Sequence, residues 1–263
     1  MHIVSRKSFL TGLAAAVMAF VSRAAAQQSA AADVAVGSVA SVRGTAIVVR
    51  RNRQFGLRVG NEIFRNDVLQ TGHDGALGVA FDDETSLVLS ANARVTVTNF
   101  VYQSGGTANA GIISVVRGTL TFFAGQVAKT GEMRIATPSA SLGIRGTTGV
   151  IDVPSGSGAN AATRIKLYPD QDGTVGRIEV FATTGAPLGQ LTQGATGLAV
   201  RLDAAATRSL GQPQFAVTPL QIAPIELTRD RAELRQLVNV RTVGRQINDI
   251  RRRGGAVPPA PRP

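Results

Sequence analysis

The sequence predicts an all-β protein that ends in one amphipathic α-helix. Three observations support this fold class. Short runs of alternating apolar and polar residues extend from Val36 to Val153. Glycine is abundant, with 29 residues, and marks turns between these runs. A helical apolar period appears only after Thr228. Aromatic residues make up 5 % of the chain and Trp is absent, so aliphatic side chains have to form the core.

The expected strands recur about every 8–12 residues, which is typical of a β-sandwich, a barrel or a β-solenoid. In Ala93–Thr98 the valines fall on one face and the polar residues on the other. The sequence predicts strands over residues 37–42, 45–50, 67–70, 76–81, 86–89, 94–100, 111–116, 119–124, 133–136, 149–153, 164–168, 177–182 and 197–202.

An Arg-Gly-Thr tripeptide occurs three times between expected strands, at residues 43–45, 117–119 and 145–147. The unequal intervals argue against a strict repeat. Glycine fits a turn or bulge, and threonine begins the next strand. We expect Gly44, Gly118 and Gly146 to mark a recurring corner.

The N-terminus has the three-part architecture of a secretory signal: basic Arg6 and Lys7, an apolar run to Val21, and small residues before Gln27. The alternative is a buried helix. Ser5–Leu10 also resembles a twin-arginine export motif, with Lys7 in the second position, so both export routes stay open. The apolar run is shorter than the roughly 20 residues that span a bilayer. We therefore expect a periplasmic or secreted protein without a membrane span.

The expected organisation has six parts. Residues 1–26 are a signal peptide, 37–153 the main β domain, and 154–210 additional strands that continue it. A Pro-containing linker follows over 211–227, then a helix over 228–253, with Thr228 as its cap. Residues 254–263 form a Pro/Arg tail that we expect to be disordered.

The positive charge lies mainly at the C-terminus. Without residues 1–26, 25 basic residues face 17 acidic ones, a net charge of +8. From Arg229 onward nine arginines face three acidic residues, a net charge of +6, which leaves +2 for the β body. Export argues against nucleic acid as a partner, and favours a protein or an anionic envelope polymer.

The C-terminal helix has two interpretations. It packs its apolar stripe on the β domain, which we favour, or it docks on a membrane surface or a partner. The oligomeric state stays open. The candidate partner-binding residues of this helix are Arg241, Arg245, Arg251, Arg252 and Arg253.

The sequence contains no convincing catalytic or metal site, and we expect no enzyme activity, metal or cofactor. Cysteine is absent, which excludes disulfides and thiolate chemistry. His73, in a Gly- and Asp-rich turn, fits a surface residue. Residues 82–84 (Asp-Asp-Glu) fit a hairpin turn better than a cation site or a carboxylate pair. Residues 170–173 resemble a calcium loop but have Phe181 where its last Glu would stand. Residues 104–107 fit a long hairpin loop.

Several segments together resemble the FecR domain family. Residues 59–72 are similar to its opening, and residues 75–97 to its next strands around an acidic turn. The strongest similarity is Thr137–Thr147, in which a Thr-Pro pair is followed by a Gly-apolar-Arg-Gly-Thr element. Residues 177–200 are similar to its terminal strands. The candidate structural or binding motif consists of Thr137, Pro138, Gly143, Arg145, Gly146 and Thr147.

The resemblance implies an all-β envelope domain without chemistry of its own, of β-sandwich or β-solenoid type. In the best-known members it relays a periplasmic signal from an outer-membrane iron transporter to a cytoplasmic sigma-factor regulator. This sequence departs from that plan, because we expect neither a cytoplasmic segment nor a spanning helix. Its acidic turn also replaces the family's usual Asp-Gly-Ser/Thr.

Three functions follow as hypotheses. The first is an exported, non-catalytic FecR-like domain that binds a protein or an envelope polymer. The second is a periplasmic regulatory component of iron-responsive cell-surface signalling. The third, least favoured, is a polysaccharide-active enzyme on a β scaffold that uses Asp82 and Asp83.

Overall fold

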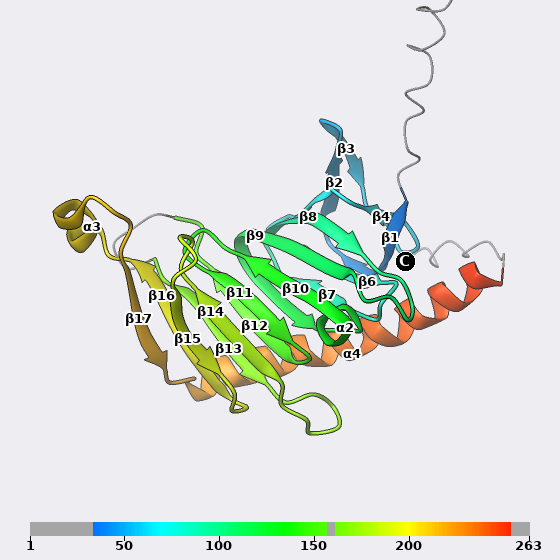
Figure 1. Cartoon of the computed structure of the whole chain (residues 1–263). Helices are drawn as coiled ribbons and strands as arrows, with labels where there is room; N and C mark the ends of the chain where they lie inside the picture. Colours follow the sequence, from blue (N-terminus) through cyan, green and yellow to red (C-terminus); the bar gives the residue numbers. More distant parts are fainter. Residues whose placement is uncertain (1–33, 157–160, 254–263) are drawn as a thin grey trace, which may run out of the picture. The chain divides into compact units, whose positions relative to one another are not determined.

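The computed structural model describes residues 34–156 and 161–253, so the expected signal peptide and tail lie outside the described residues. Strands predominate in the described part, and one long helix, α4, follows them (Figure 1). This confirms the all-β class with a C-terminal helix. The sandwich or solenoid detail stays a prediction.

The strands pair in two groups, sheet A and sheet B, which share the long strand β9. Neighbours in sheet A are all antiparallel. In order across the sheet, they are β4 (Glu62–Phe64), β1 (Ala35–Arg43), β6 (Ala76–Phe81), β7 (Ser86–Leu89), β9 (Asn109–Phe123), β12 (Thr148–Val153), β13 (Thr163–Tyr168), β16 (Thr196–Leu202) and β17 (Phe215–Leu220).

Sheet B is antiparallel except where β9 and β10 run parallel, with the one-turn helix α2 (Val127–Thr130) between them. The apolar core draws buried side chains from both sheets, for example Leu69 and Ile113 from sheet B and Leu77 and Ile165 from sheet A. The order in sheet B is β3 (Arg53–Gly56), β2 (Ala46–Arg50), β5 (Val68–Thr71), β8 (Arg94–Val101), β9, β10 (Gly131–Ala136), β11 (Ser141–Arg145), β14 (Arg177–Phe181) and β15 (Pro187–Leu191).

Strand β9 corrects the expectation of two separate strands over 111–116 and 119–124. Up to Arg117 it pairs with β8 in sheet B, and from Gly118 onward it pairs with β12 in sheet A. Gly118 has φ +89°, and an added Cβ would lie 2.5 Å from Ala93 Cα. Only glycine fits this crossing without strain, so one strand changes sheets where the sequence indicated a break.

Several elements were not expected from the sequence. Strand β3 is exposed at every residue and has no apolar alternation, and β4, β11 and β15 are only three to five residues long. Helix α3 (Ala204–Leu210) is also additional. The expected linker over 211–227 contains β17 and the start of α4. Strand β17 tolerates Pro219 because, among the described residues, its ladder is with β16 alone.

Helix α4 spans Pro224–Arg252 and begins four residues earlier than expected. Ala223 is its N-cap, and Pro224 takes the first turn, where its missing N–H matters least. Thr228 is therefore not the cap, and its Oγ1 donates to the Pro224 carbonyl at 3.0 Å. Among the described residues, no helix is long and apolar enough to cross a membrane.

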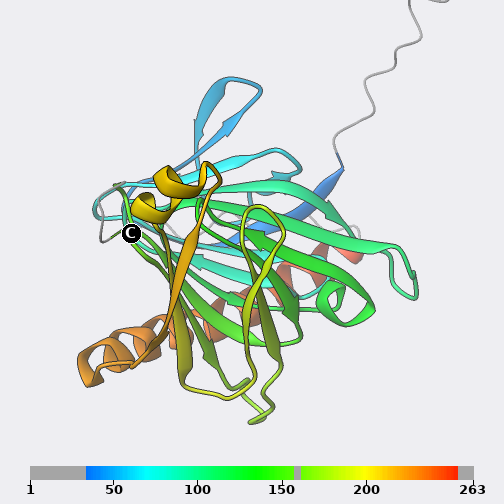
Figure 2. The same cartoon turned by 60° about the vertical axis from the view of Figure 1, so that its left-hand side comes forward.

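The helix lies along one face of sheet A and contacts β1, β6, β7 and β9 (Figures 1 and 2). Leu237 and Val240 are buried in a small apolar cluster with Ala40, Ala80 and Phe123 of the sheet. The packing interpretation of the helix is thus confirmed.

Candidate functional site

The three Arg-Gly-Thr tripeptides lie where the chain passes between the sheets. Gly44 separates β1 of sheet A from β2 of sheet B, and Gly146 separates β11 of sheet B from β12 of sheet A. Their φ angles are +58° and +54°. Together with Gly118 in β9, they form the recurring corner that the sequence predicts.

The last corner belongs to the FecR-like motif and has structural contacts. Arg145 is exposed, and its Nη1 donates to the Gly131 carbonyl at 3.1 Å. The Thr147 side chain is buried, and its carbonyl accepts the Ala124 N–H. Gly143 lies on β11, beside Glu179 of β14. These contacts fit a structural corner.

The Thr-Pro part of the motif forms a tight turn between β10 and β11. The Thr137 N–H and hydroxyl both donate to the Ala140 carbonyl, at 2.8 and 2.9 Å, and the Ala140 N–H donates back to Thr137 Oγ1 at 3.0 Å. This closed set of bonds fixes Pro138 and Ser139 at the tip of the turn.

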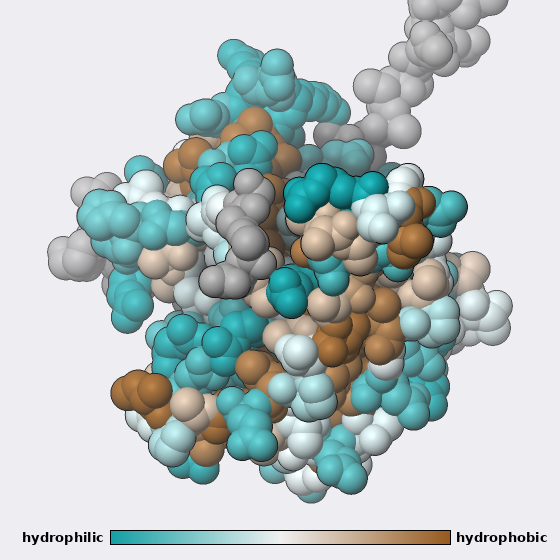
Figure 3. All heavy atoms as spheres, turned by 90° about the vertical axis from the view of Figure 1, so that its left-hand side faces the viewer, coloured by the Kyte–Doolittle hydropathy of each residue, from teal (hydrophilic) through white to brown (hydrophobic). Residues whose placement is uncertain are grey.

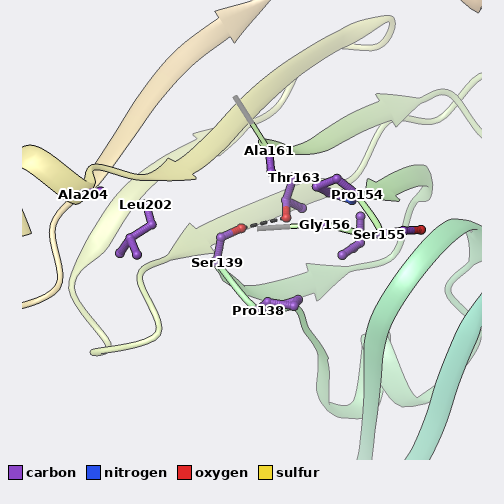
Figure 4. Close-up of a pocket in the computed structure, with 10 residues that line it drawn as sticks. Pro138, Ser139, Pro154, Ser155, Gly156, Ala161, Thr163, Leu202 and Ala204 are labelled. Carbon is purple, nitrogen blue, oxygen red and sulfur yellow. Dashed lines mark hydrogen bonds between the residues drawn. The ribbon is translucent and has the colours of Figure 1, made fainter. Parts of the chain in front are cut away.

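Pro138 and Ser139 line a cavity of about 550 Å³, which we call the end pocket (Figure 4). Ser139 Oγ donates to Thr163 Oγ1 at 2.7 Å, which ties the turn to β13. Leu202 and Ala204 lie across from Pro154 and Ser155 in the close-up. The lining residues are Pro138, Ser139, Val153, Pro154, Ser155, Gly156, Ala161, Thr163, Leu202 and Ala204.

The end pocket is lined by uncharged residues. It offers prolines, small apolar groups and hydroxyls, and none of its lining residues is charged. Such a surface provides no acid, base or anion-binding group. It can bind an uncharged segment through apolar contact and a few hydrogen bonds.

The surface beside the end pocket is also partly apolar. Figure 3 views this end and shows apolar side chains gathered between polar regions. In the described part of the chain, sheets A and B end here in β17, which pairs with β16, and β15, which pairs with β14. Leu198, Phe215 and Val217 are only partly buried against the core, and Leu202 is 47 % exposed.

The acidic turn between β6 and β7 holds Asp83 as a buried structural residue. Its carboxylate accepts bonds from Thr85 N–H and Oγ1, both at 2.7 Å, and from Val127 N–H at 2.9 Å. Burial raises the pKa of Asp83. Asp82 and Glu84 instead line a polar cavity of about 410 Å³ with Tyr102 and Gln126. Asp82 and Asp83 therefore do not face one cavity as a catalytic pair.

The other candidate turns have ordinary structural roles. His73 is exposed in the turn between β5 and β6. Within residues 170–174, Gly173 N–H donates to the Asp170 carbonyl at 3.0 Å, and Asp172 accepts Thr174 N–H at 2.9 Å, as in a closed turn. The described residues contain no group of three or more His, Cys, Asp or Glu side chains placed to hold a metal.

The candidate arginines of α4 mostly contact the β domain. Arg245 pairs with Glu84 at 2.9 Å, and Arg251 with Glu62 at 3.1 Å. The Arg241 guanidinium lies 3.5 Å from the centre of the Phe123 ring, and burial lowers its pKa. Arg253 is exposed, and the Arg252 side chain lies outside the described atoms.

A buried charge cluster beneath the first half of α4 was missed from the sequence. Lys166 of β13 is fully buried, and its Nζ lies 2.6 Å from Asp230 and 3.0 Å from Asp152. Tyr168 donates its hydroxyl to Asp230 at 2.7 Å, and burial raises the Tyr168 pKa. Arg229 lies 3.3 Å from Asp152. The sequence offered one signal for this cluster. Because Lys166 stands between the apolar residues Ile165 and Leu167 in a strand, its side chain has to point to the opposite face from theirs.

Comparison with known families supports the resemblance. Residues 67–175 match the family model described as FecR protein, which confirms the FecR domain that the motifs indicate. The matched region runs from the start of β5 to just before β14 and includes the Thr137–Thr147 motif. A search of curated proteins finds no match.

Two crystal structures of a candidate anti-sigma factor from Parabacteroides distasonis ATCC 8503, at 2.50 and 1.65 Å resolution, are weakly similar in fold. The TM-scores are 0.40 and 0.39, at 11 % sequence identity over 57 % of this chain. The alignment spans 58 % of the length of those chains.

Proposed function

We propose that this protein is a non-catalytic regulatory component of the cell envelope, which binds a partner protein through the end pocket. The main support for this proposal is that the Thr137–Thr147 motif, through Pro138 and Ser139, lines one wall of the pocket. The Thr137 turn is closed by three hydrogen bonds and presents Pro138 and Ser139 to the cavity.

The chemistry of the pocket supports a polypeptide as its occupant. Its uncharged lining and the partly apolar edge around β17 fit a segment with small, uncharged side chains. The edge of β17 that pairs with no described strand offers backbone groups to an extended segment. A highly charged polymer would find no matching group among the lining residues of this pocket.

The FecR match favours a role in signalling, and location in the periplasm or outside the cell follows from the expected signal peptide. The iron-responsive version of this role is a second candidate, favoured by the same family match. It predicts that expression of the protein rises on iron limitation. Fractionation of cells, with N-terminal sequencing of the mature protein, tests the location.

The binding proposal is tested by placing a photoreactive amino acid at Leu202, on the pocket wall. Irradiation of whole cells should give one adduct of constant mass. The same amino acid at Val116, which is 44 % exposed on β9, is the matched control and should give none.

The captured protein is then purified and titrated against wild type and an Ala204→Trp variant, in which the indole fills the pocket. We expect at least tenfold weaker binding by the variant. Equal adducts from both positions, or equal affinity of wild type and variant, would contradict the proposal.

A further inference from the structure

Helix α4 packs on the β domain, and several of the arginines that the alternative docking interpretation would use contact that domain. Three of its arginines pair with carboxylates of the β domain: Arg229 with Asp152, Arg245 with Glu84, and Arg251 with Glu62. These ion pairs tie the helix to the domain, although the Arg229 and Arg245 side chains stay 53 % and 55 % exposed. Arg231 and Arg235 of the helix are exposed as well, and a second concentration of positive charge lies elsewhere on the described surface.

It is found around the β2–β3 hairpin. Residues 50–67 contain five arginines and two acidic residues, Glu62 and Asp67. Both acids are matched, since Asp67 is buried against Arg50 at 2.7 Å and Glu62 pairs with Arg251. Arg53, Arg58 and Arg65 are exposed, and their side chains make no ion pair with a described residue.

The hairpin projects beyond the neighbouring strands (Figures 1 and 2). All four residues of β3 are exposed, and the turn consists of Arg51 and Asn52, both with positive φ. Phe55 is 47 % exposed. Because residues two apart share a face of a strand, Phe55 and Arg53 lie on the same face of β3.

The C-terminal turn of α4 brings more positive charge to this region. Glu62 links the two elements, because its carboxylate contacts Arg251 and its carbonyl accepts a bond from Arg50 Nη2 at 3.0 Å. Arg253, two residues further along, is exposed. Glu62 thus joins the end of the helix to the hairpin region, and we call the exposed residues Arg53, Arg58, Arg65, Arg253 and Phe55 the hairpin surface.

We infer that the hairpin surface binds an anionic lipid membrane peripherally. Exposed arginines attract lipid headgroups of negative charge, and an exposed aromatic ring beside them inserts at the boundary between headgroups and acyl chains. The aromatic ring favours a membrane over a soluble polyanion, which would use the arginines alone. This inference does not depend on a partner in the end pocket.

The test is sedimentation of the purified protein with vesicles of phosphatidylcholine containing 30 % phosphatidylglycerol, and with vesicles of phosphatidylcholine alone. We expect binding to the anionic vesicles only, weakening as salt is added. The double variant Arg53→Ser/Arg65→Ser should bind roughly 30-fold more weakly. The matched control is Arg201→Ser/Arg208→Ser, which removes two exposed arginines elsewhere and should bind like wild type.

Phe55→Ser separates a membrane from a soluble polyanion. It should weaken vesicle binding but leave binding to soluble polyphosphate unchanged. If the two double variants lose vesicle binding equally, the hairpin surface is not the site. If Phe55→Ser has no effect on vesicle binding while polyphosphate binds as tightly as vesicles, the partner is a soluble polyanion and the inference is wrong.

Discussion

At the scale of single residues, Asp83 shows how a buried carboxylate can position backbone rather than perform chemistry. It bonds Thr85 within its own turn and Val127 at the start of α2, so it links two segments that are 44 residues apart. Gly125 lies so close that an added Cβ would be 2.3 Å from the Asp83 carbonyl oxygen. The residue is therefore a structural link between the turn and α2.

Asp83→Asn should destabilise the protein by about 1–3 kcal/mol at neutral pH. Both oxygens of the carboxyl group can accept in either protonation state, whereas the amide offers one oxygen to the three donors and turns its NH₂ group toward a donor. Urea unfolding measures the effect. Asp249→Asn, at an exposed position of α4, is the control and should change stability by no more than about 0.5 kcal/mol.

The difference in stability between wild type and Asp83→Asn should also depend on pH. Burial raises the pKa of Asp83 above its ordinary value of 3.8, so the folded state holds this proton more tightly than the unfolded state. The stability from this group is fully present below pH 3.8 and is lost as pH rises through the raised pKa. The advantage of wild type over Asp83→Asn should therefore shrink as pH rises. An advantage that grows with pH would show that the hydrogen bonds outweigh burial.

At the scale of elements, two glycines let α4 approach sheet A closely. An added Cβ at Gly244 of the helix would lie 2.1 Å from Ala80 Cβ on β6. One at Gly78, also on β6, would lie 2.3 Å from Val240 Cγ2. Glycine in a helix interior is unfavourable by about 1 kcal/mol relative to alanine, so packing explains its position here.

Gly244→Ala should lower the melting temperature, although alanine is the better helix former. The added methyl group overpacks against Ala80, which typically costs about 1–3 kcal/mol. Asn239→Ala, exposed on the same helix, gains helix propensity without a clash and should not lower it. Thermal unfolding by circular dichroism distinguishes them. A Gly244→Ala variant more stable than wild type would mean that the helix does not lie this close to β6.

The elements also show what the sequence could predict. The short apolar runs of β6 and β7 were predicted at their observed bounds, and nearly all their residues are buried because one face packs in the core and α4 covers the other. Strand β3 was missed because it has no buried face. Strand β17 was missed because Pro219 within it, with Pro213 and Pro224 on either side, suggested a linker. The motif at Thr137 was recognisable, but the end pocket was not, because its walls come from segments far apart in the chain.

At the scale of the whole molecule, polar contacts repeat at helical spacing along α4 and fix its position on sheet A. Glu226 pairs with Arg164 at 2.7 Å, Asp230 with Lys166, and Glu233 accepts bonds from Ser90 and Thr121, both at 2.7 Å. Arg245 and Arg251 add two ion pairs nearer the C-terminal end of the helix. Sliding the helix by one turn would separate all these partners, so they specify its register.

Lys166→Met tests this role of the buried pair. The substitution leaves Asp230 buried without its closest cation and should destabilise the protein by about 3–5 kcal/mol. Replacing both charges, in Lys166→Met/Asp230→Leu, should restore much of that loss, because no unpaired charge remains. Denaturant unfolding gives both values, and hydrogen exchange of the α4 amides reports whether the helix opens separately from the sheets.

The two variants should differ in where they lose stability. In Lys166→Met, exchange should accelerate mainly in the first half of α4, where Asp230 lies, and less around Gly244, where the apolar contacts remain. In the double variant, the α4 amides should again be protected from exchange, although the ion pair that helps to fix the register of the helix is gone. If the single variant is as stable as wild type, Arg229, 3.6 Å from Asp230, suffices as its counter-charge, and Lys166 does not hold the helix on the sheet.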